Sequence, residues 1–395
     1  MKILLLAPHP FYQERGTPIA VNLLLKALSE RGDKIDVLTY HIGADTVHAN
    51  VAIHRIARIP FIKSVRPGFS FKKIVCDIFM FRQAVRMARK GRYDVVHAVE
   101  ESVFMAGTIR RITGTPYVCD MDSSMPLQIC EKSPLFRILL PVMRWLERRA
   151  IRSASAVAAV CDSLADIARG HGAGEVVVLN DISLLTPVPD ERAGEIRAKL
   201  DLSGVCFMYV GNLESYQGID LLLESFCSLV KTFPDSVLVI AGGDQTGVKH
   251  YGEKARSMGI GGKVRLIGTW PVDDMASLLS AADILVSPRI KGNNTPMKIY
   301  SYLDSGKPIL ATDIPSHTQV LTRDVSVLAA PEPAAFGQAM ASLAKDPALR
   351  AKLGGRGKAL AQEKYCFNAY RKTIVGLYEW LEAVVVQPSA TLRLG

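Results

Sequence analysis

The stretch that decides the fold is "ADILVSPRIKGNNTPMKIYSYLDSGKPILATD", residues 282–313. Its two ends, "ADILVSP" and "PILATD", are short apolar runs typical of buried strands. Between them, Thr295 suits a helix N-cap and Pro296 the first helical position. Gly306 can adopt the left-handed conformation after the last turn, and Pro308 prevents further helix. The stretch therefore predicts a β-α-β unit.

Such a unit places the start of the helix at the carboxyl end of a parallel strand, where open α/β sheets bind ligands. Unpaired backbone N–H groups at that end, with Lys298 one turn into the helix, favour an anion. We therefore expect an anion site here.

Apolar runs alternate with helical segments along the rest of the chain, which indicates parallel, doubly wound sheets. We predict two Rossmann-like domains facing a central cleft, residues 1–185 and 204–365, joined by a polar linker at 186–203. A last helix, 366–386, is expected to pack back across both. The basic region up to Gly91 should contain one loop and one helix, and Pro141 should kink a later helix. The expected strands are 2–8, 34–40, 94–99, 116–122, 156–162, 175–181, 205–211, 236–242, 264–268, 282–288, 308–313 and 325–330.

The composition is that of an ordinary globular chain, with 49% apolar and 22% charged residues in 395. The seven cysteines are scattered without a C-x-x-C pair, which argues against a zinc site and for a reducing compartment. The opening apolar run is too short for a signal peptide, and nothing approaches eighteen consecutive apolar residues. We expect a cytoplasmic protein.

The net charge of +10 is concentrated in residues 55–92, which contain eleven Lys or Arg and one acid, Asp77. A second basic face follows at 137–152, with five arginines among apolar residues at helical spacing. Either segment could simply be a solvated surface. The alternative is contact with anionic lipid headgroups or an anionic acceptor, at the inner face of a membrane. No nucleic-acid motif is present, so nucleic acid is not an expected partner.

Five stretches, in this order along the chain, resemble the retaining GT-B glycosyltransferases of family 4: "QERGTPIAVNLLLKALSERG", "DVVHAVEE", "YVGNLESYQGIDLLLESF", "VRLIGTW" and the stretch 282–313. The resemblance covers nearly the whole chain. It implies a hexosyltransferase-type enzyme whose C-terminal domain holds a nucleotide-diphosphate sugar, most often of UDP or GDP. It also implies a lipid-linked or polysaccharide acceptor in cell-surface synthesis, and no cofactor or metal.

The donor side departs from the family pattern. The positions of two family glutamates are Asn293 and Ser301 here, and those of a phosphate-binding Arg and Lys are Asn212 and Gln217. Amide and hydroxyl groups can still hydrogen-bond sugar and ribose hydroxyls. The resemblance also assigns to the donor side Gly16, Gly268, Asn294 and Thr295. We expect Arg289 and Lys298 to replace the lost bases and act on the diphosphate.

The acceptor side departs too, because Asp122, the third catalytic candidate beside Arg289 and Lys298, stands where the family often has a histidine. Asp120, His97, Glu100 and Glu101 are the other polar candidates there. His97 could equally be a core histidine, and the two glutamates could cap the next helix. Asp120 and Asp122 spell Asp-x-Asp, yet they belong to the acceptor-side domain, so no metal site is expected.

Two alternatives remain open. One is a sugar-nucleotide epimerase on the same fold, which would need no acceptor. The other is a catalytically degenerate binding protein, suggested by the missing carboxylates. A dinucleotide dehydrogenase is disfavoured because no G-x-G-x-x-G follows the first strand.

Overall fold

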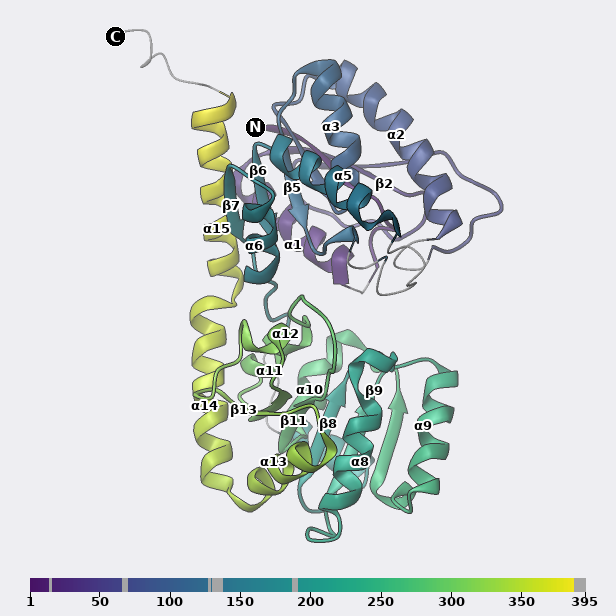
Figure 1. The fold of residues 1–395 in the computed structure, drawn as a ribbon, viewed down its shortest axis with the longest axis vertical. Helices are drawn as coiled ribbons and strands as arrows, with labels where there is room; N and C mark the ends of the chain where they lie inside the picture. The colour runs from purple at the N-terminus through teal and green to yellow at the C-terminus, as the bar shows by residue number, and fades with distance from the viewer. Residues whose placement is uncertain (14–15, 66–69, 127–128, 130–137, 187–190, 387–395) are drawn as a thin grey trace. The chain divides into compact units, whose positions relative to one another are not determined.

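The computed structural model describes residues 1–13, 16–65, 70–126, 129, 138–186 and 191–386. The chain divides into two compact units (Figure 1). The first unit is Met1–Asn180 together with the chain from Tyr370 onward, and the second is Asp181–Ala369. Each unit is built around one parallel sheet covered by helices.

The first unit contains a seven-stranded parallel sheet in the order β3-β2-β1-β4-β5-β6-β7. The direction of strand addition reverses between β1 and β4, which makes their carboxyl ends the switch point of the sheet. The strands are β1 Lys2–Ala7, β2 Lys34–Thr39, β3 Val51–Arg55, β4 Val95–Val99, β5 Tyr117–Met121, β6 Ala156–Ala159 and β7 Glu175–Val178. The helices include α1 Gly16–Arg31, α2 Phe71–Gly91, α3 Ser102–Thr113, α5 Leu140–Ser153 and α6 Asp162–Gly170.

The second unit contains a six-stranded parallel sheet in the order β10-β9-β8-β11-β12-β13, with its switch point between β8 and β11. The strands are β8 Cys206–Val210, β9 Val237–Ala241, β10 Val264–Gly268, β11 Ile284–Ser287, β12 Ile309–Thr312 and β13 Ser326–Ala329. The helices include α7 Glu191–Lys199, α8 Ile219–Leu229, α9 Gln245–Ser257, α10 Met275–Ser280, α11 Lys298–Asp304, α12 Pro315–Thr318, α13 Pro333–Lys345 and α14 Pro347–Lys364.

Helix α15, Phe367–Trp380, continues as a π-helical turn, Leu381–Val386. From Tyr370 onward it belongs to the first unit. There Arg371 pairs with Glu30 of α1 at 3.1 Å, and Leu377, Tyr378 and Leu381 are buried. The first unit is therefore completed by the last helix of the chain.

The twelve predicted strands are all present, including the parallel pair β11 and β12 of the opening stretch. Three local expectations were wrong. Strand β3 lies in the basic region expected to hold only a loop and a helix. Pro141 occupies the first turn of α5, so it begins the helix and does not kink it. The expected linker contains α7, whose Ile196 is part of the second unit's core.

No helix among these described elements is both long and apolar enough to cross a bilayer.

Candidate functional site

Lys298 lies at the carboxyl edge of the second sheet and is the first residue of α11. Its Nζ donates to Oε1 of the buried Gln217 at 3.1 Å. The same ammonium lies 3.9 Å from the centre of the Tyr209 ring, a cation–π contact. Gly211 leaves room for it, because a Cβ there would stand 3.0 Å from Nζ. Strand β8, its following turn and α11 thus converge on one amino group.

Arg289 follows β11 and is buried, although it is one of the longest and most polar side chains. Its guanidinium holds the loop before α11: Nε donates to the Lys291 carbonyl at 2.6 Å, and the two terminal nitrogens donate to Asn294 at 3.2 Å each. Gly292 makes this possible, since a Cβ there would stand 1.9 Å from the guanidinium. We call these contacts the arginine clamp. It holds a second positive charge beside Lys298.

Burial, reinforced by the charge of Arg289, holds the pKa of Lys298 well below its ordinary value. No carboxylate pairs with the Lys298 ammonium within the described part of the chain. An anion bound beside Lys298 would supply the missing countercharge and so oppose the lowering of its pKa by burial and by Arg289. The site is therefore built to receive negative charge.

His317 connects the two strands that flank α11 in the chain, β11 and β12. It is fully buried and joins two strands: Nε2 lies 2.9 Å from Ser287 Oγ of β11, and Nδ1 lies 2.9 Å from the Thr312 carbonyl of β12. Burial, together with the charges of Lys298 and Arg289, lowers its pKa to about 3. His317 lies in the short helix α12 and is a neutral strut of the sheet edge.

The expectation that Thr295 caps the helix was wrong. Helix α11 begins at Lys298 with Met297 at the N-cap position and without a side-chain capping bond. A tight turn precedes it, in which the Ile299 amide bonds to the Pro296 carbonyl at 2.9 Å. The hydroxyl of Thr295 is buried and has no hydrogen-bond partner among the described residues. Helix α11 thus begins at Lys298, two residues later than the predicted start at Pro296.

The other predicted donor residues lie on the same edge or near it. The Asn212 carbonyl accepts from the Tyr209 hydroxyl at 2.6 Å, and the exposed Asn293 accepts from Gln319 at 2.8 Å through its carbonyl. Ser301 is a half-buried residue within α11. Gly268 ends β10 with a φ of +67° and accepts from the Gly242 amide. Nothing here assigns these residues a ligand.

In the first unit, His97 of β4 is completely buried between two partners. Its Nε2 lies 3.1 Å from Asp120 Oδ2 at the end of β5, and its Nδ1 lies 2.8 Å from the Tyr378 hydroxyl of α15. The arrangement fits the alternative of a core histidine. It also fixes the orientation of the Asp120 carboxylate at the switch-point end of the sheet.

Glu100 and Glu101 follow β4 and do not cap the next helix. Glu101 occupies the N-cap position of α3 without a capping bond, and pairs instead with Lys73 of α2 at 2.6 Å. Glu100 adopts a left-handed φ of +50° and lies 3.9 Å from the same ammonium. Lys73 could not be recognised as a partner of these glutamates from the sequence, because they are more than twenty residues away.

Two further candidates lie beside these. Gly16 is the first residue of α1, with open space around the position of a Cβ. Asp122 follows β5 directly and is half-buried. In the described portion of the chain, no group of three or more His, Cys, Asp or Glu could hold a metal ion.

Comparisons with known proteins agree with this architecture. Residues 15–180 match the glycosyl transferase 4-like domain, and residues 195–360 match glycosyl transferases group 1. The chain is 24% identical over 398 residues to a phosphatidyl-myo-inositol mannosyltransferase of Mycobacterium leprae, an alignment covering 96% of each chain.

Two solved structures share the fold over nearly the whole chain. Sucrose-phosphate synthase from Thermosynechococcus elongatus has a TM-score of 0.80 at 18% identity, covering 97% of this chain and 99% of that one. HepE from Anabaena in complex with UDP has a TM-score of 0.75 at 16% identity, covering 96% and 100%.

The two parallel-sheet units define a GT-B fold, and the class of protein is a glycosyltransferase. The chain belongs to family 4 of these enzymes, with one family domain matched in each unit.

Proposed function

We propose that the chain transfers a hexose from a nucleotide-diphosphate sugar to an acceptor hydroxyl with retention of anomeric configuration. The observation that carries this is the pairing of Lys298 with the arginine clamp, a cationic site without a carboxylate partner for its lysine. A diphosphate supplies the countercharge that such a site lacks. The Anabaena protein of the same fold was crystallised with UDP, which supports UDP as the first donor to test.

In this proposal, Lys298 contributes electrostatically. Negative charge accumulates on the diphosphate as its bond to the sugar lengthens, and an ammonium held in place by Gln217 and Tyr209 stabilises that charge without reorganising. An anion also restores the charged form of a lysine whose pKa is lowered. The proposal requires no protein nucleophile, metal or cofactor.

The acceptor is proposed to be lipid-linked or a polysaccharide, used in cell-surface synthesis at the inner face of a membrane. The name of the M. leprae relative specifies a lipid, phosphatidyl-myo-inositol. In this chain, the basic segment 55–92 contains the whole of α2, which exposes Phe71, Ile78 and Phe79 among its lysines and arginines. Such a mixture suits peripheral contact with anionic membrane.

The experiment is a thermal-shift panel of UDP, GDP, ADP, CDP and TDP with and without magnesium. A ligand at about a hundred times its dissociation constant should stabilise the native state by about 2.7 kcal/mol. One diphosphate should stand out without magnesium, and its sugar conjugates are then assayed for diphosphate release with a membrane-lipid extract.

The Lys298→Ala variant, which lacks the ammonium proposed to contact the diphosphate, is measured in parallel. Binding without release by any donor would support the degenerate binding protein, and release of free sugar without acceptor would support the epimerase. If no nucleotide shifts the melting temperature, the donor site is refuted.

A further inference from the structure

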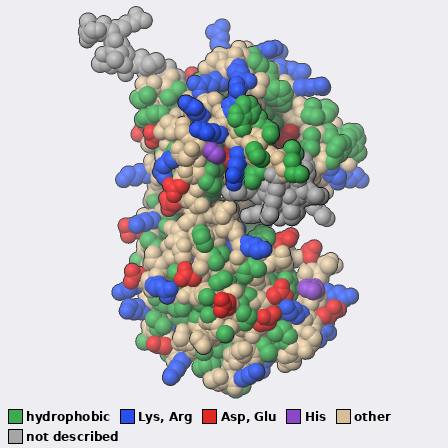
Figure 2. All heavy atoms as spheres, in the orientation of Figure 1, with side chains coloured by type: hydrophobic (Ala, Val, Ile, Leu, Met, Phe, Trp, Pro, Cys, Tyr) green, Lys and Arg blue, Asp and Glu red, His purple; other side chains and the backbone are tan. Residues whose placement is uncertain are grey.

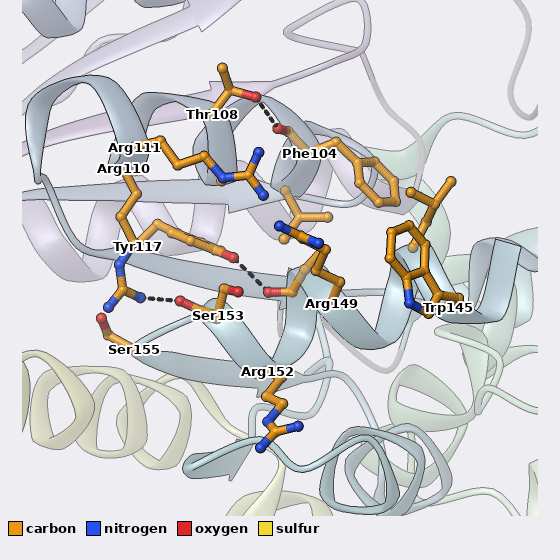
Figure 3. Close-up of a pocket in the computed structure, with 15 residues that line it drawn as sticks. Phe104, Thr108, Arg110, Arg111, Tyr117, Trp145, Arg149, Arg152, Ser153 and Ser155 are labelled. Carbon is orange, nitrogen blue, oxygen red and sulfur yellow. Dashed lines mark hydrogen bonds between the residues drawn. The ribbon is translucent and has the colours of Figure 1, made fainter. Parts of the chain in front are cut away.

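A second site lies in the first unit, on the outer side of the helices that cover its sheet. It is a groove of about 920 Å³ between α3 and α5 (Figure 3). Among the described residues, its lining contains four arginines and no Asp or Glu: Arg110 and Arg111 from the end of α3, and Arg149 and Arg152 from α5. The sequence marked the arginines of α5 as a basic face but gave no sign that α3 completes a groove.

The contacts of these arginines within the described ranges are with a backbone carbonyl and an aromatic ring. Arg110 donates to the Ser153 carbonyl, and Arg149 lies over the Trp145 ring at 5.6 Å. Figure 3 shows the guanidinium groups of Arg111 and Arg149 both directed into the space between the helices. Over the described ranges, none of the four forms an ion pair with a carboxylate.

The acid on α5 nearest in sequence faces away. Glu147 is buried on the opposite side of the helix, where it accepts from the Ser124 hydroxyl at 3.0 Å and the Met125 amide at 3.1 Å. Burial raises the pKa of this carboxyl, although its hydrogen bonds oppose the shift. The positive charge of the groove is therefore not offset by its own helix.

One end of the groove is apolar. Phe104, Trp145 and Leu146 line it, and Trp145 leaves 57% of its surface exposed. Val142, 56% exposed, lies one turn before Leu146, so the apolar stripe continues along α5 beyond the groove. Figure 2 shows hydrophobic and Lys or Arg side chains interspersed over this unit. Exposed apolar surface next to arginines that pair with no carboxylate of the described ranges favours a ligand with both characters.

We propose that this groove binds the headgroup of an anionic phospholipid. Arg111 and Arg149 bind the phosphate, for which the planar guanidinium is suited. The glycerol and first acyl carbons lie along Trp145 and Leu146, because an indole ring suits the boundary between headgroup and chain. The site is separate from the donor site, which belongs to the other unit, and does not depend on nucleotide.

The test uses soluble dihexanoyl phosphatidylglycerol below its micelle concentration. Trp145 is the reporter, in a full-length variant in which Trp270 and Trp380 are replaced by phenylalanine. We expect a saturable blue shift of Trp145 emission, with at least tenfold weaker binding in Arg111→Gln/Arg149→Gln. These arginines are exposed, so the variant should fold, and its melting temperature checks this.

Two control variants also remove two positive charges each. Lys249→Gln/Lys352→Gln changes exposed residues of the second unit and should leave binding unchanged. Arg144→Gln/Arg148→Gln lies on α5 outside the groove and should weaken binding less than twofold. An equal loss in this variant would show a diffuse charged surface and overturn the proposal.

Three ligands decide the chemistry. Dihexanoyl phosphatidylcholine binding as tightly would show that the apolar end alone acts, and inorganic phosphate binding as tightly would identify a free-phosphate site. A short oligonucleotide displacing the lipid at a lower concentration would point to a nucleic-acid surface. Each of these results overturns the assignment to anionic lipid.

Discussion

His317 should make the second unit sensitive to acid although it is a neutral strut in the folded protein. Its folded-state pKa is about 3, whereas the ordinary value, expected after unfolding, is 6.5. Between these values the unfolded chain binds more protons than the folded one, so the free energy of unfolding falls as pH is lowered. The contribution is fully present above pH 6.5 and is lost toward pH 3.

The size follows from the two pKa values. One pKa unit corresponds to about 1.4 kcal/mol, so the full difference amounts to roughly 5 kcal/mol. Between pH 7 and pH 5 only the first part is lost, roughly 2 kcal/mol. The side chain is fully buried, so solvent does not reduce the effect.

The assay is urea denaturation of the full chain at pH 7 and pH 5 at constant ionic strength, followed by the second unit's Trp270. His317→Gln keeps a donor and an acceptor for Ser287 and Thr312 but does not titrate. The wild type should lose about 2 kcal/mol more than this variant. The exposed His250→Gln is the control and should behave as wild type. Equal losses in wild type and His317→Gln would refute the reasoning.

Three further predictions concern the two units. Lys298→Ala should lower turnover on the order of a hundredfold, as loss of a preorganised electrostatic contact does, whereas Lys298→Arg should retain part of the wild-type turnover. Diphosphate release measures both variants, and near-normal turnover in a folded alanine variant would contradict the proposed role. Gly292→Ala should displace the arginine clamp, because its Cβ would collide with the Arg289 guanidinium and its φ is +131°; the free energy of unfolding should fall by about 1–3 kcal/mol and the diphosphate affinity by about tenfold. Gly262→Ala, in open space, should change neither quantity, and calorimetry that finds the two variants alike would exclude the clamp. Tyr378→Phe should destabilise the first unit by about 1–2 kcal/mol, because it removes the partner of Nδ1 of the buried His97 and leaves only the Asp120 contact at Nε2. Unchanged urea unfolding would show that the bond contributes nothing.

Most strands could be predicted because fully buried parallel strands are continuous apolar runs, such as Val237–Ala241. Strand β3 was missed because it lies at the sheet edge, is only partly buried, and contains His54 and Arg55. The predicted N-cap at Thr295 was wrong because the rules for helix starts do not include side-chain contacts of the preceding loop. The arginine clamp fixes the preceding loop, and the chain then makes one tight turn before the helix begins.

The candidate site was only half visible in the sequence. Lys298 and Arg289 could be identified from the β-α-β pattern, since both lie within one local unit. The contacts between the candidates could not be predicted. The resemblance assigned Gln217 to the donor side, but its bond to Lys298 joins residues 81 apart, and the His97–Tyr378 bond of the first unit joins residues 281 apart. Contacts at such separations are created by the order of strands in a sheet, which local patterns do not contain.

Helix α15 gives the chain a particular order of assembly during synthesis. The second unit is one continuous segment, whereas the first is closed only by residues that follow it. About 190 residues separate Asn180 from Tyr370, so a ribosome adding roughly 5–20 residues per second needs on the order of 10–40 s between them. During that interval the surface beside His97 that Tyr378 later covers is exposed on the nascent chain. The second unit can fold first, and the first unit depends meanwhile on chaperones or on its own partial stability.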